Sequence, residues 1–366
     1  MRILMIAPAP FDFDRGKSIR VRQTVRHLSR LGYEVDVLTY PSGRAVDDDS
    51  VTVERAPSLF AQTDPSTPGF SLRQAFSNLS LVRRAIQRLR TGRYDAVHAH
   101  DVDGALIAQL ARKGLRTDIP LVYDMHGTFE ELNAHYDVVD SQSLVRRVEQ
   151  YLYDSADHLV VNWPHITDQI ETRTPQTLIM DEPDGEVCDR LDALRSGTAT
   201  VDRDGWEDDP YILYTGNYAP YQGIDLLIDA FQHLDNGSVR LVMTGNAPEE
   251  YVVEDPNVLY TGFVGEPRLA DLLYGADVLV SPRQTDGFPP MKMLYYVRTD
   301  APIVATDRMC HRSVLDDVDG VTFAEETPSE FATALEDALS QRPNRRDDAQ
   351  TDPTAEYESV YAEVAT

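Results

Sequence analysis

The sequence predicts an α/β protein with two doubly wound domains, each a parallel sheet covered by helices. Short β-branched runs alternate with segments of helical periodicity, and this alternation begins a second time near residue 210. The 366 residues are also too many for one ordinary hydrophobic core. We therefore expect two domains that face a cleft, with ligands at the carboxyl ends of both sheets.

The first half should contain strands separated by helices. The strands are expected at Ile3–Ala7, Val35–Thr39, Ala96–Ala99, Leu121–Asp124 and Leu159–Val161. Apolar residues at helical spacing lie between them, for example Val21, Val25 and Leu28. We assign residues 1–180 to this N-terminal domain.

The second half repeats the pattern over residues 210–345. Its strands are expected at Tyr211–Tyr214, Val239–Thr244, Val258–Thr261, Val278–Ser281 and Ile303–Thr306. Residues 181–209 are rich in Asp, Gly, Pro and Ser with little periodicity, and we interpret them as a linker. In residues 346–366, Tyr357 and Tyr361 recur at helical spacing, which favours a terminal helix crossing back to the N-terminal domain.

The composition is strongly acidic. The chain has 61 Asp and Glu against 34 Lys and Arg, a net charge of −27, and its only lysines are Lys17, Lys113 and Lys292. Such a surface is typical of a halophilic protein, because a Debye length of about 3 Å at 1 M salt screens self-repulsion. The same balance argues against general nucleic-acid binding.

Other sequence features limit the location and the chemistry. Cys188 and Cys310 fit neither a disulfide framework nor a zinc site and are expected to be small buried hydrophobes. No targeting segment precedes the first strand, and no apolar run is long enough to span a bilayer. We expect a cytoplasmic protein. Any contact that it makes with a membrane should be peripheral and on the inner face of that membrane. A nicotinamide enzyme is not expected, because no G-x-G-x-x-G follows a strand.

A glycine loop after the strand Tyr211–Tyr214 is the most informative segment. The strand stops before Gly216, a polar loop with Gly223 follows, and apolar residues then recur at helical spacing from Ile224 to Phe231. A strand, a glycine loop and a helix together present backbone N–H groups to an anion, usually a phosphate. An ordinary turn, in which the glycines only reverse the chain, fits equally well.

A second candidate anion site follows the strand Val278–Ser281. Its loop carries Arg283, Asp286 and Gly287, and a helix should begin near Pro290 with Lys292 in its first turn. A cation in the first turn opposes the helix dipole. An anionic ligand explains this lysine more simply than a surface position does.

The N-terminal domain carries a basic stretch after its first strand. Residues 15–33 contain no acid and six cations, which are Arg15, Lys17, Arg20, Arg22, Arg26 and Arg30. Gly16 permits a close approach of the backbone to a ligand. We expect the first three cations to meet a phosphate or lipid phosphate, and Arg26 and Arg30 to lie on a solvated helix face.

His126 should lie at the cleft edge, because it follows the strand Leu121–Asp124 and precedes Gly127. A histidine there can donate to a developing negative charge or to a sugar hydroxyl, although a structural role is equally open. His100 and Asp101 are weaker candidates at another strand end. No residue spacing resembles a metal site.

Together these segments resemble the retaining GT-B glycosyltransferases of family 4, also called group 1. In that family an acceptor loop follows the first strand, here Asp14-Arg15-Gly16-Lys17, and a histidine closes a later strand, matched by His126 in YDMHG. The start of the second domain is matched by TGN and YQGIDLLIDAF. The resemblance covers most of the chain and implies two Rossmann-like domains facing a cleft.

The resemblance implies a hexosyltransferase that moves a sugar from a nucleotide-diphosphate sugar to a hydroxyl of a glycan or lipid-linked acceptor. It implies retention of configuration, with no metal and no cofactor. The residues expected to act are, for catalysis, His126 and Asp286; for the donor, Gly216, Asn217, Gln222, Gly223, Arg283, Gly287, Lys292 and Tyr295; and for the acceptor, Arg15, Gly16, Lys17 and Arg20.

The chain departs from the family pattern at the donor site. Asn217 and Gln222 replace an arginine and a lysine that hold the diphosphate, at about 1.5–3 kcal/mol for each charge-assisted bond. Asp286 and Tyr295 stand for two glutamates, and Lys292 with Arg283 is the available source of positive charge. Two alternatives stay open: a non-catalytic sugar-binding partner of another transferase, and a nucleotide-sugar epimerase.

Residues Leu72–Arg93 predict a basic amphipathic helix. The segment has six arginines and no acid, with apolar residues at helical spacing. Such a helix can lie on an anionic membrane surface, which would suit a polyprenyl-phosphate-linked acceptor. A domain-surface helix packed through its apolar side is equally compatible with the pattern.

Overall fold

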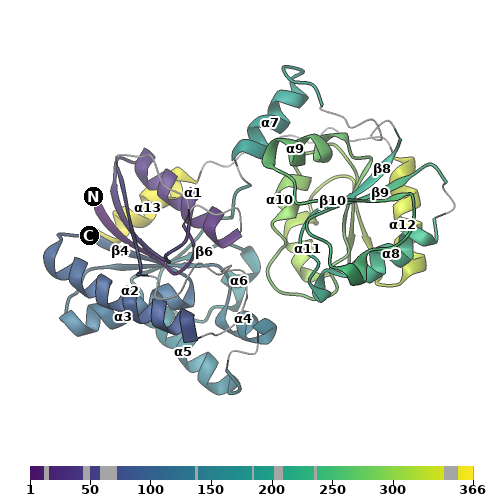
Figure 1. Cartoon of the computed structure of the whole chain (residues 1–366). Helices are drawn as coiled ribbons and strands as arrows, with labels where there is room; N and C mark the ends of the chain where they lie inside the picture. The colour runs from purple at the N-terminus through teal and green to yellow at the C-terminus, as the bar shows by residue number, and fades with distance from the viewer. Residues whose placement is uncertain are drawn as a thin grey trace. The chain divides into compact units, whose positions relative to one another are not determined.

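Two compact units make up the chain in the computed structural model (Figure 1). Unit 1 comprises Met1–Glu182 and Thr351–Thr366, and unit 2 comprises Pro183–Gln350. The structure describes residues 1–11, 16–43, 50–57, 72–136, 139–183, 185–201, 209–234, 237–341 and 353–365, without the side chains of residues 16, 72–74, 134–136 and 168.

Unit 1 contains a seven-stranded parallel sheet with the order β3-β2-β1-β4-β5-β6-β7. The strands are β1 (Arg2–Ala7), β2 (Glu34–Thr39), β3 (Val51–Arg55), β4 (Ala96–His100), β5 (Leu121–Met125), β6 (His158–Val161) and β7 (Gln176–Leu178). Every residue of β4, β5 and β6 is buried. This burial explains their continuous apolar runs, since helices cover both faces of a parallel sheet.

Helices cover both faces of the sheet in unit 1. They are α1 (Gly16–Arg30), α2 (Leu72–Thr91), α3 (Asp101–Leu115), α4 (Phe129–Tyr136), α5 (Gln142–Ser155), α6 (Pro164–Gln169) and α13 (Thr354–Val364). Figure 1 shows α1 with the terminal helix α13 on one face, and α2, α3 and α5 on the other. Tyr357, Val360 and Tyr361 of α13 belong to the same core cluster as Val21 and Val25 of α1.

Unit 2 contains a six-stranded parallel sheet with the order β10-β9-β8-β11-β12-β13. The strands are β8 (Tyr211–Tyr214), β9 (Arg240–Thr244), β10 (Val258–Gly262), β11 (Val278–Ser281), β12 (Ile303–Thr306) and β13 (Val321–Ala324). The helices are α7 (Gly185–Arg195), α8 (Ile224–Gln232), α9 (Glu266–Gly275), α10 (Lys292–Tyr296), α11 (Met309–Leu315) and α12 (Pro328–Ser340). The predicted α/β class with parallel sheets is confirmed.

Each strand expected from the sequence is present, and three further strands were not anticipated. These are β3 and β7 at the edges of the first sheet and β13 at an edge of the second. Their residues are mostly exposed or half-buried, so they carry no continuous apolar run. Both cysteines are buried and free, as expected.

Residues 181–209 differ from the linker expected there, because α7 forms within them. This helix belongs to unit 2 and packs against α9 through a face of buried residues, which are Val187, Cys188, Leu191 and Leu194. Because acidic residues and arginines lie between these positions, the helical period of the apolar residues was not recognised in the sequence.

Strand order reverses once in each sheet. The reversal lies between β1 and β4 in unit 1 and between β8 and β11 in unit 2. Doubly wound sheets bind ligands at the carboxyl ends of the strands at such switch points. The residues that follow these strands are therefore the candidate functional residues in each unit.

Candidate active-site residues in the two units

Lys292, on α10, is the central side chain at the switch point of unit 2. Its ammonium lies 3.4 Å from Oε1 of Gln222 and 4.0 Å from the centre of the Tyr214 ring. The residue is only 8% exposed, and among the described residues no carboxylate is paired with it. Burial, and then repulsion from Arg283, hold the pKa of Lys292 well below its ordinary value.

The glycine loop supplies two carboxamides beside this lysine. Nε2 of Gln222 donates to Oδ1 of Asn217 at 3.4 Å, and the backbone N–H of Ala219 donates to the same oxygen at 3.0 Å. Gln222 is buried, whereas Asn217 is exposed. The two carboxamides hold one another, and Gln222 contacts Lys292, but neither adds charge.

Two glycines allow the loop to pass this close. Gly216 has φ +142°, and a Cβ there would lie 3.3 Å from Nζ of Lys292. Gly223 has φ +68°, and a Cβ there would lie 2.0 Å from the carbonyl oxygen of Pro282. A larger residue at Gly223 would push the loop away from the end of β11, and one at Gly216 would crowd the ammonium of Lys292.

Arg283 closes the loop that follows β11. The guanidinium is almost fully buried and donates to the carbonyl oxygens of Thr285 at 2.9 Å and Phe288 at 2.8 Å. It also lies 5.1 Å from the centre of the Tyr221 ring. Arg283 thus shapes the loop and contributes positive potential near Lys292.

The other predicted donor residues lie in or after the same loop. The Asp286 carboxylate, about half exposed, accepts from the backbone N–H of Cys310 at 3.4 Å and lies 3.6 Å from Arg308, at the start of α11. Gly287 has φ +125°, which turns the loop. Tyr295 is half-buried and packs against the apolar cluster that includes Leu191 and Leu272, so its ring belongs to the core on that side.

His126 follows β5 in unit 1, as expected. Its Nε2 lies 3.0 Å from Nδ1 of His100, and the two rings meet edge to face with centroids 5.2 Å apart. Burial, partly offset by Asp101 and Asp124, lowers the pKa of His126 below its ordinary value. The imidazole is therefore mostly neutral near pH 7.

Further polar residues lie behind His126. We call His98, His100, Asp124, His126 and Tyr361 the histidine network. Its members come from β4, from β5 and the residue after it, and from α13. Three of these residues, His98, Asp124 and Tyr361, were not among the candidates from the sequence. The alternation HAH in β4 was the available signal, since His100 lies opposite Asp124 in the sheet register.

The predicted acceptor residues have different environments. Lys17 pairs with Asp101, and although burial opposes the charge, Asp101 and Asp103 raise the pKa of Lys17 above its ordinary value. Arg20 is buried, with Nε 2.8 Å from Oδ1 of Asp124 and Nη1 2.6 Å from Oδ1 of Asp181. Gly16 begins α1, and Arg15 lies outside the described residues.

Within the described part of the chain, one group of side chains has ligand atoms close enough for a metal ion. The donor atoms of His98, His100 and Asp124 lie within 4.8 Å of one another. The guanidinium of Arg20 already balances Asp124, and both ring nitrogens of His98 have hydrogen-bond partners. The group fits a hydrogen-bonded network better than a cation site.

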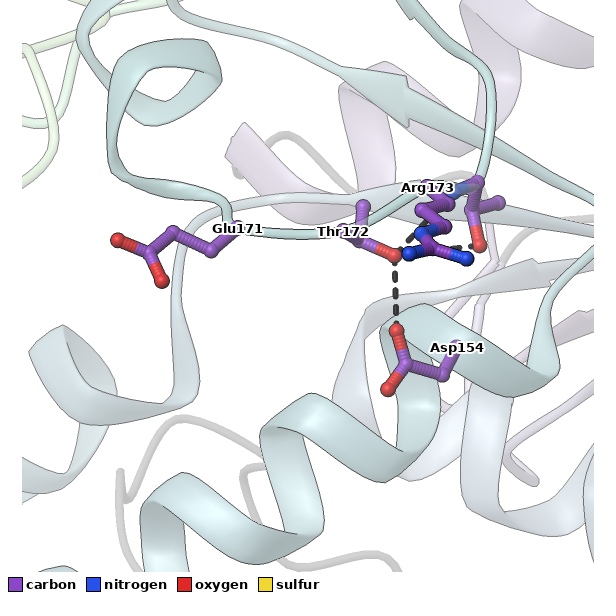
Figure 2. Close-up of a pocket in the computed structure, with 5 residues that line it drawn as sticks. Asp154, Glu171, Thr172 and Arg173 are labelled. Carbon is purple, nitrogen blue, oxygen red and sulfur yellow. Dashed lines mark hydrogen bonds between the residues drawn. The ribbon is translucent and has the colours of Figure 1, made fainter.

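An open hollow of about 660 Å³ lies elsewhere in unit 1, lined by Asp154 and residues 171–174. Figure 2 shows Thr172 directed at Asp154, to which it donates at 2.9 Å. The segment precedes β7, so the hollow lies at the amino ends of the strands, opposite to His126. Thr174 donates to the Tyr153 carbonyl at 2.7 Å, so these polar groups satisfy each other.

Two family models match the chain. The model described as glycosyl transferase 4-like domain matches residues 15–176, and the model described as glycosyl transferases group 1 matches residues 209–341. Between them they span most of both units. The chain belongs to the group 1 glycosyltransferases. The resemblance to this family, and the expectation of a glycosyltransferase, are therefore confirmed.

Curated relatives of this glycosyltransferase include D-inositol 3-phosphate glycosyltransferases. The protein from Corynebacterium aurimucosum is 25% identical over an alignment of 382 positions, gaps included, that covers 94% of this chain and 89% of the relative. The protein from Xylanimonas cellulosilytica is 28% identical over 353 residues, which cover 87% and 82%.

Solved structures of other enzymes share the fold of this glycosyltransferase. Sucrose-phosphate synthase from Thermosynechococcus elongatus gives a TM-score of 0.70 at 16% identity, covering 100% of this chain and 93% of that one. HepE of Anabaena in complex with UDP gives 0.64 at 16% identity, covering 100% and 94%. These matches confirm a GT-B fold with two Rossmann-like domains.

Proposed function

We propose that this glycosyltransferase binds a nucleotide-diphosphate sugar through unit 2. In the proposed reaction it transfers the sugar, with retention and without a metal, to a hydroxyl of a glycan or polyprenyl-phosphate-linked acceptor. The observation that carries the proposal is Lys292, a buried ammonium at the switch point with no carboxylate partner among the described residues. An isolated buried charge is unfavourable, so an anion is the group that this position suits.

In the proposed complex, Lys292 contacts the diphosphate and regains its full charge. Gly216 and Gly223 keep backbone N–H groups accessible, and α8 directs the positive end of its dipole at the phosphates. Asn217 and Gln222 contribute neutral hydrogen bonds, each weaker than the bond of a cation. Negative charge on the departing diphosphate is stabilised by the same groups.

The remaining donor contacts come from the loop after β11. We assign sugar hydroxyls to Asp286, because a carboxylate has about four acceptor sites and the described contacts to Cys310 and Arg308 leave some of them available. Arg283 and Gly287 keep this loop in shape. Tyr295 stands where the family pattern has the glutamate at the ribose, and a phenol there would replace the carboxylate.

Acceptor binding is assigned to unit 1. His126 would contact the reacting groups, and Gly16, Lys17 and Arg15 would hold the acceptor's phosphate or hydroxyls. The two carboxylate partners of Arg20 favour an indirect contribution, in which this residue holds Asp124 in place. Retention would follow from attack of the acceptor hydroxyl on the face that the diphosphate leaves.

The helix α2 supports a membrane-linked acceptor. Its exposed side chains recur at helical spacing on one face, which consists of Phe76, Leu79, Arg83, Gln87, Arg90 and Thr91. The opposite side, including Leu81 and Ala85, is buried, and α2 packs against α3. The expectation of a domain-surface helix packed through its apolar side describes the buried face, and we propose that the exposed face contacts an anionic membrane peripherally. No helix of the described residues is long and apolar enough to cross a bilayer.

The experiment for the membrane contact compares Leu79→Ser with Leu144→Ser in sedimentation with anionic phosphatidylglycerol vesicles. Leu79 is 67% exposed on α2, and Leu144 is 51% exposed on α5. We expect loss of vesicle binding in Leu79→Ser alone. Equal binding of both variants and the wild type would contradict the contact.

The experiment for the donor site is a thermal-shift screen of nucleotide-diphosphate sugars and free nucleotide diphosphates in molar salt. A ligand at a hundredfold its Kd should stabilise the protein by about 2.7 kcal/mol. A selective shift supports the donor site and names the nucleotide. If no donor shifts the melting temperature, the donor proposal fails and the non-catalytic partner becomes the better account.

Retention is tested separately by NMR of the product formed from the donor identified in the screen. The proposal predicts that the anomeric configuration of the donor is kept. Turnover in excess EDTA tests independence from metals, and inversion or loss of turnover would contradict the corresponding part.

A further inference from the structure

A series of buried polar contacts in the histidine network runs from α13 to His126. The phenol oxygen of Tyr361 lies 2.7 Å from Nδ1 of His98, and Nε2 of His98 lies 3.2 Å from Oδ2 of Asp124. The same carboxylate oxygen lies 3.7 Å from Nδ1 of His100, which lies 3.0 Å from Nε2 of His126. Every side chain before His126 is fully buried, so water cannot exchange for these contacts.

The positions of the protons in the first half of the network follow from Asp124. Burial raises the pKa of this carboxyl, but Arg20 and the neighbouring histidines outweigh that effect and hold it far below the ordinary value. An ionised carboxylate only accepts, so Nε2 of His98 donates to it. Burial keeps the pKa of Tyr361 well above its ordinary value, and the phenol donates to Nδ1 of His98.

His100 has one proton to place between two nitrogens, because burial holds its pKa well below the ordinary value. Nδ1 faces the Asp124 carboxylate and His126. Nε2 is buried, with no partner among the described residues. A buried N–H without an acceptor is rarer in proteins than a buried acceptor without a donor. Nε2 of His100 is therefore the bare nitrogen, and the proton is on Nδ1. Nδ1–H therefore donates to Nε2 of His126.

We infer that Tyr361, His98, Asp124 and His100 are positioning residues that fix His126 in its Nδ1–H tautomer and orient its ring. Nε2 of His126 accepts from His100, so the proton of the neutral ring is on Nδ1, which is the nitrogen left to donate to the reacting groups. The other tautomer would present a lone pair there. The inference rests on the proposed role of His126, and it makes α13, at the far end of the sequence, part of that site.

The direct test is the tautomer of His126 in the full chain, read from long-range ¹H–¹⁵N correlation spectra with ¹⁵N-labelled histidine near pH 7. Signals of His126 are identified by their loss in His126→Gln. We expect Nδ1 of His126 to carry the proton and Nε2 to be bare. Protonation at Nε2 would overturn the inference, whatever the variants do in an activity assay.

A matched pair of variants tests the contribution of α13. Tyr361→Phe removes the phenol that contacts His98, and Tyr357→Phe removes a buried phenol on the same helix that lies 2.9 Å from Oγ1 of Thr24. Each loses one buried hydrogen bond, so a loss of stability alone would affect both alike. We expect only Tyr361→Phe to change the ¹⁵N signals of His126. Equal spectral changes would contradict the network.

Variants at His100 test the last contact. We expect His100→Leu to lower kcat about tenfold, the rate equivalent of one lost hydrogen bond, with the KM for donor unchanged. His100→Asn can place an amide N–H near the position of Nδ1 and should recover most of the rate. Equal loss in both variants, or a change in donor KM alone, would contradict positioning. Full activity of His126→Ala would instead refute the proposed role of His126 and leave the tautomer result standing.

Discussion

At the scale of residues, Lys292 shows a conflict between stability and binding. A lysine buried without a carboxylate partner costs folding free energy, and the lowered pKa expresses that cost. Its Gln222 and Tyr214 contacts soften the cost without removing it. We attribute the presence of this buried lysine in so lysine-poor a sequence to the proposed ligand binding.

Replacement of Lys292 by methionine should therefore stabilise the free protein while weakening donor binding. Between the lowered folded pKa and the ordinary value of 10.5, the unfolded chain binds more protons, so the free energy of unfolding of the wild type rises with pH. We expect Lys292→Met to exceed the wild type by about 1 kcal/mol near neutral pH, narrowing as the pH approaches 10.5. Denaturant unfolding of both proteins between neutral pH and pH 10.5 measures this difference in stability. A variant less stable than the wild type would contradict the unfavourable burial.

We expect His126 to affect turnover strongly and the binding of the nucleotide-sugar donor only slightly. The residue belongs to unit 1, whereas the nucleotide-sugar contacts are assigned to unit 2, and in the proposal its neutral imidazole donates a hydrogen bond. We expect His126→Ala to lower kcat by about 10²–10⁴-fold, the usual range for an acid–base group, with donor binding largely retained. Steady-state kinetics and a donor titration check both parts, and full activity would refute the role.

At the scale of elements, the proposed donor complex depends on the charge supplied by the glycine loop between β8 and α8. The loop holds carboxamides where the resemblance to the family implies cations, and Asn217 is exposed at the surface. An arginine there would not add a second buried charge beside Lys292. A substitution at Asn217 therefore tests the effect of charge on donor binding without the cost to folding of burying that charge.

We expect Asn217→Arg to tighten binding of the nucleotide diphosphate about tenfold, near the low end for one charge-assisted bond. Asn217→Gln, which keeps the carboxamide, is the control and should change the affinity little. Calorimetric titration of both variants gives the comparison. Unchanged or weaker binding in the arginine variant would place the diphosphate elsewhere.

The elements also show what the sequence could and could not predict. Buried strands such as β5 and β11 could be predicted because a continuous apolar run between two helical segments is typical of a parallel strand covered on both faces. The helix α7 and the edge strands β3, β7 and β13 were missed because their partly exposed residues carry weak periodicity. Gln222 and Lys292, which the motif positions after β8 and β11 assigned to the same donor site, contact one another in the structure. The contacts of His98 and Tyr361 could not be predicted, since 263 positions separate them and only the packing of α13 joins them.

At the scale of the whole molecule, the net charge of −27 is the dominant feature. Self-repulsion of this size destabilises the compact state in dilute buffer, and screening removes most of it as the Debye length falls to about 3 Å at 1 M salt. We therefore expect the melting temperature to rise between 0.1 and 1 M KCl. Thermal unfolding at fixed pH over this range checks the expectation. A flat or falling profile would contradict a halophilic design of the surface.

The central claim, that Lys292 receives the donor diphosphate, is tested most directly by titrating Lys292→Ala and Lys113→Ala with the donor found in the screen, in molar salt. The two lysines are matched because each ammonium lies over a tyrosine ring, at 4.0 Å from the Tyr214 centre and 4.5 Å from the Tyr151 centre. The account predicts binding at least about tenfold weaker in Lys292→Ala, corresponding to about 1.4 kcal/mol, and wild-type affinity in Lys113→Ala. Equal affinities in the two variants would contradict it.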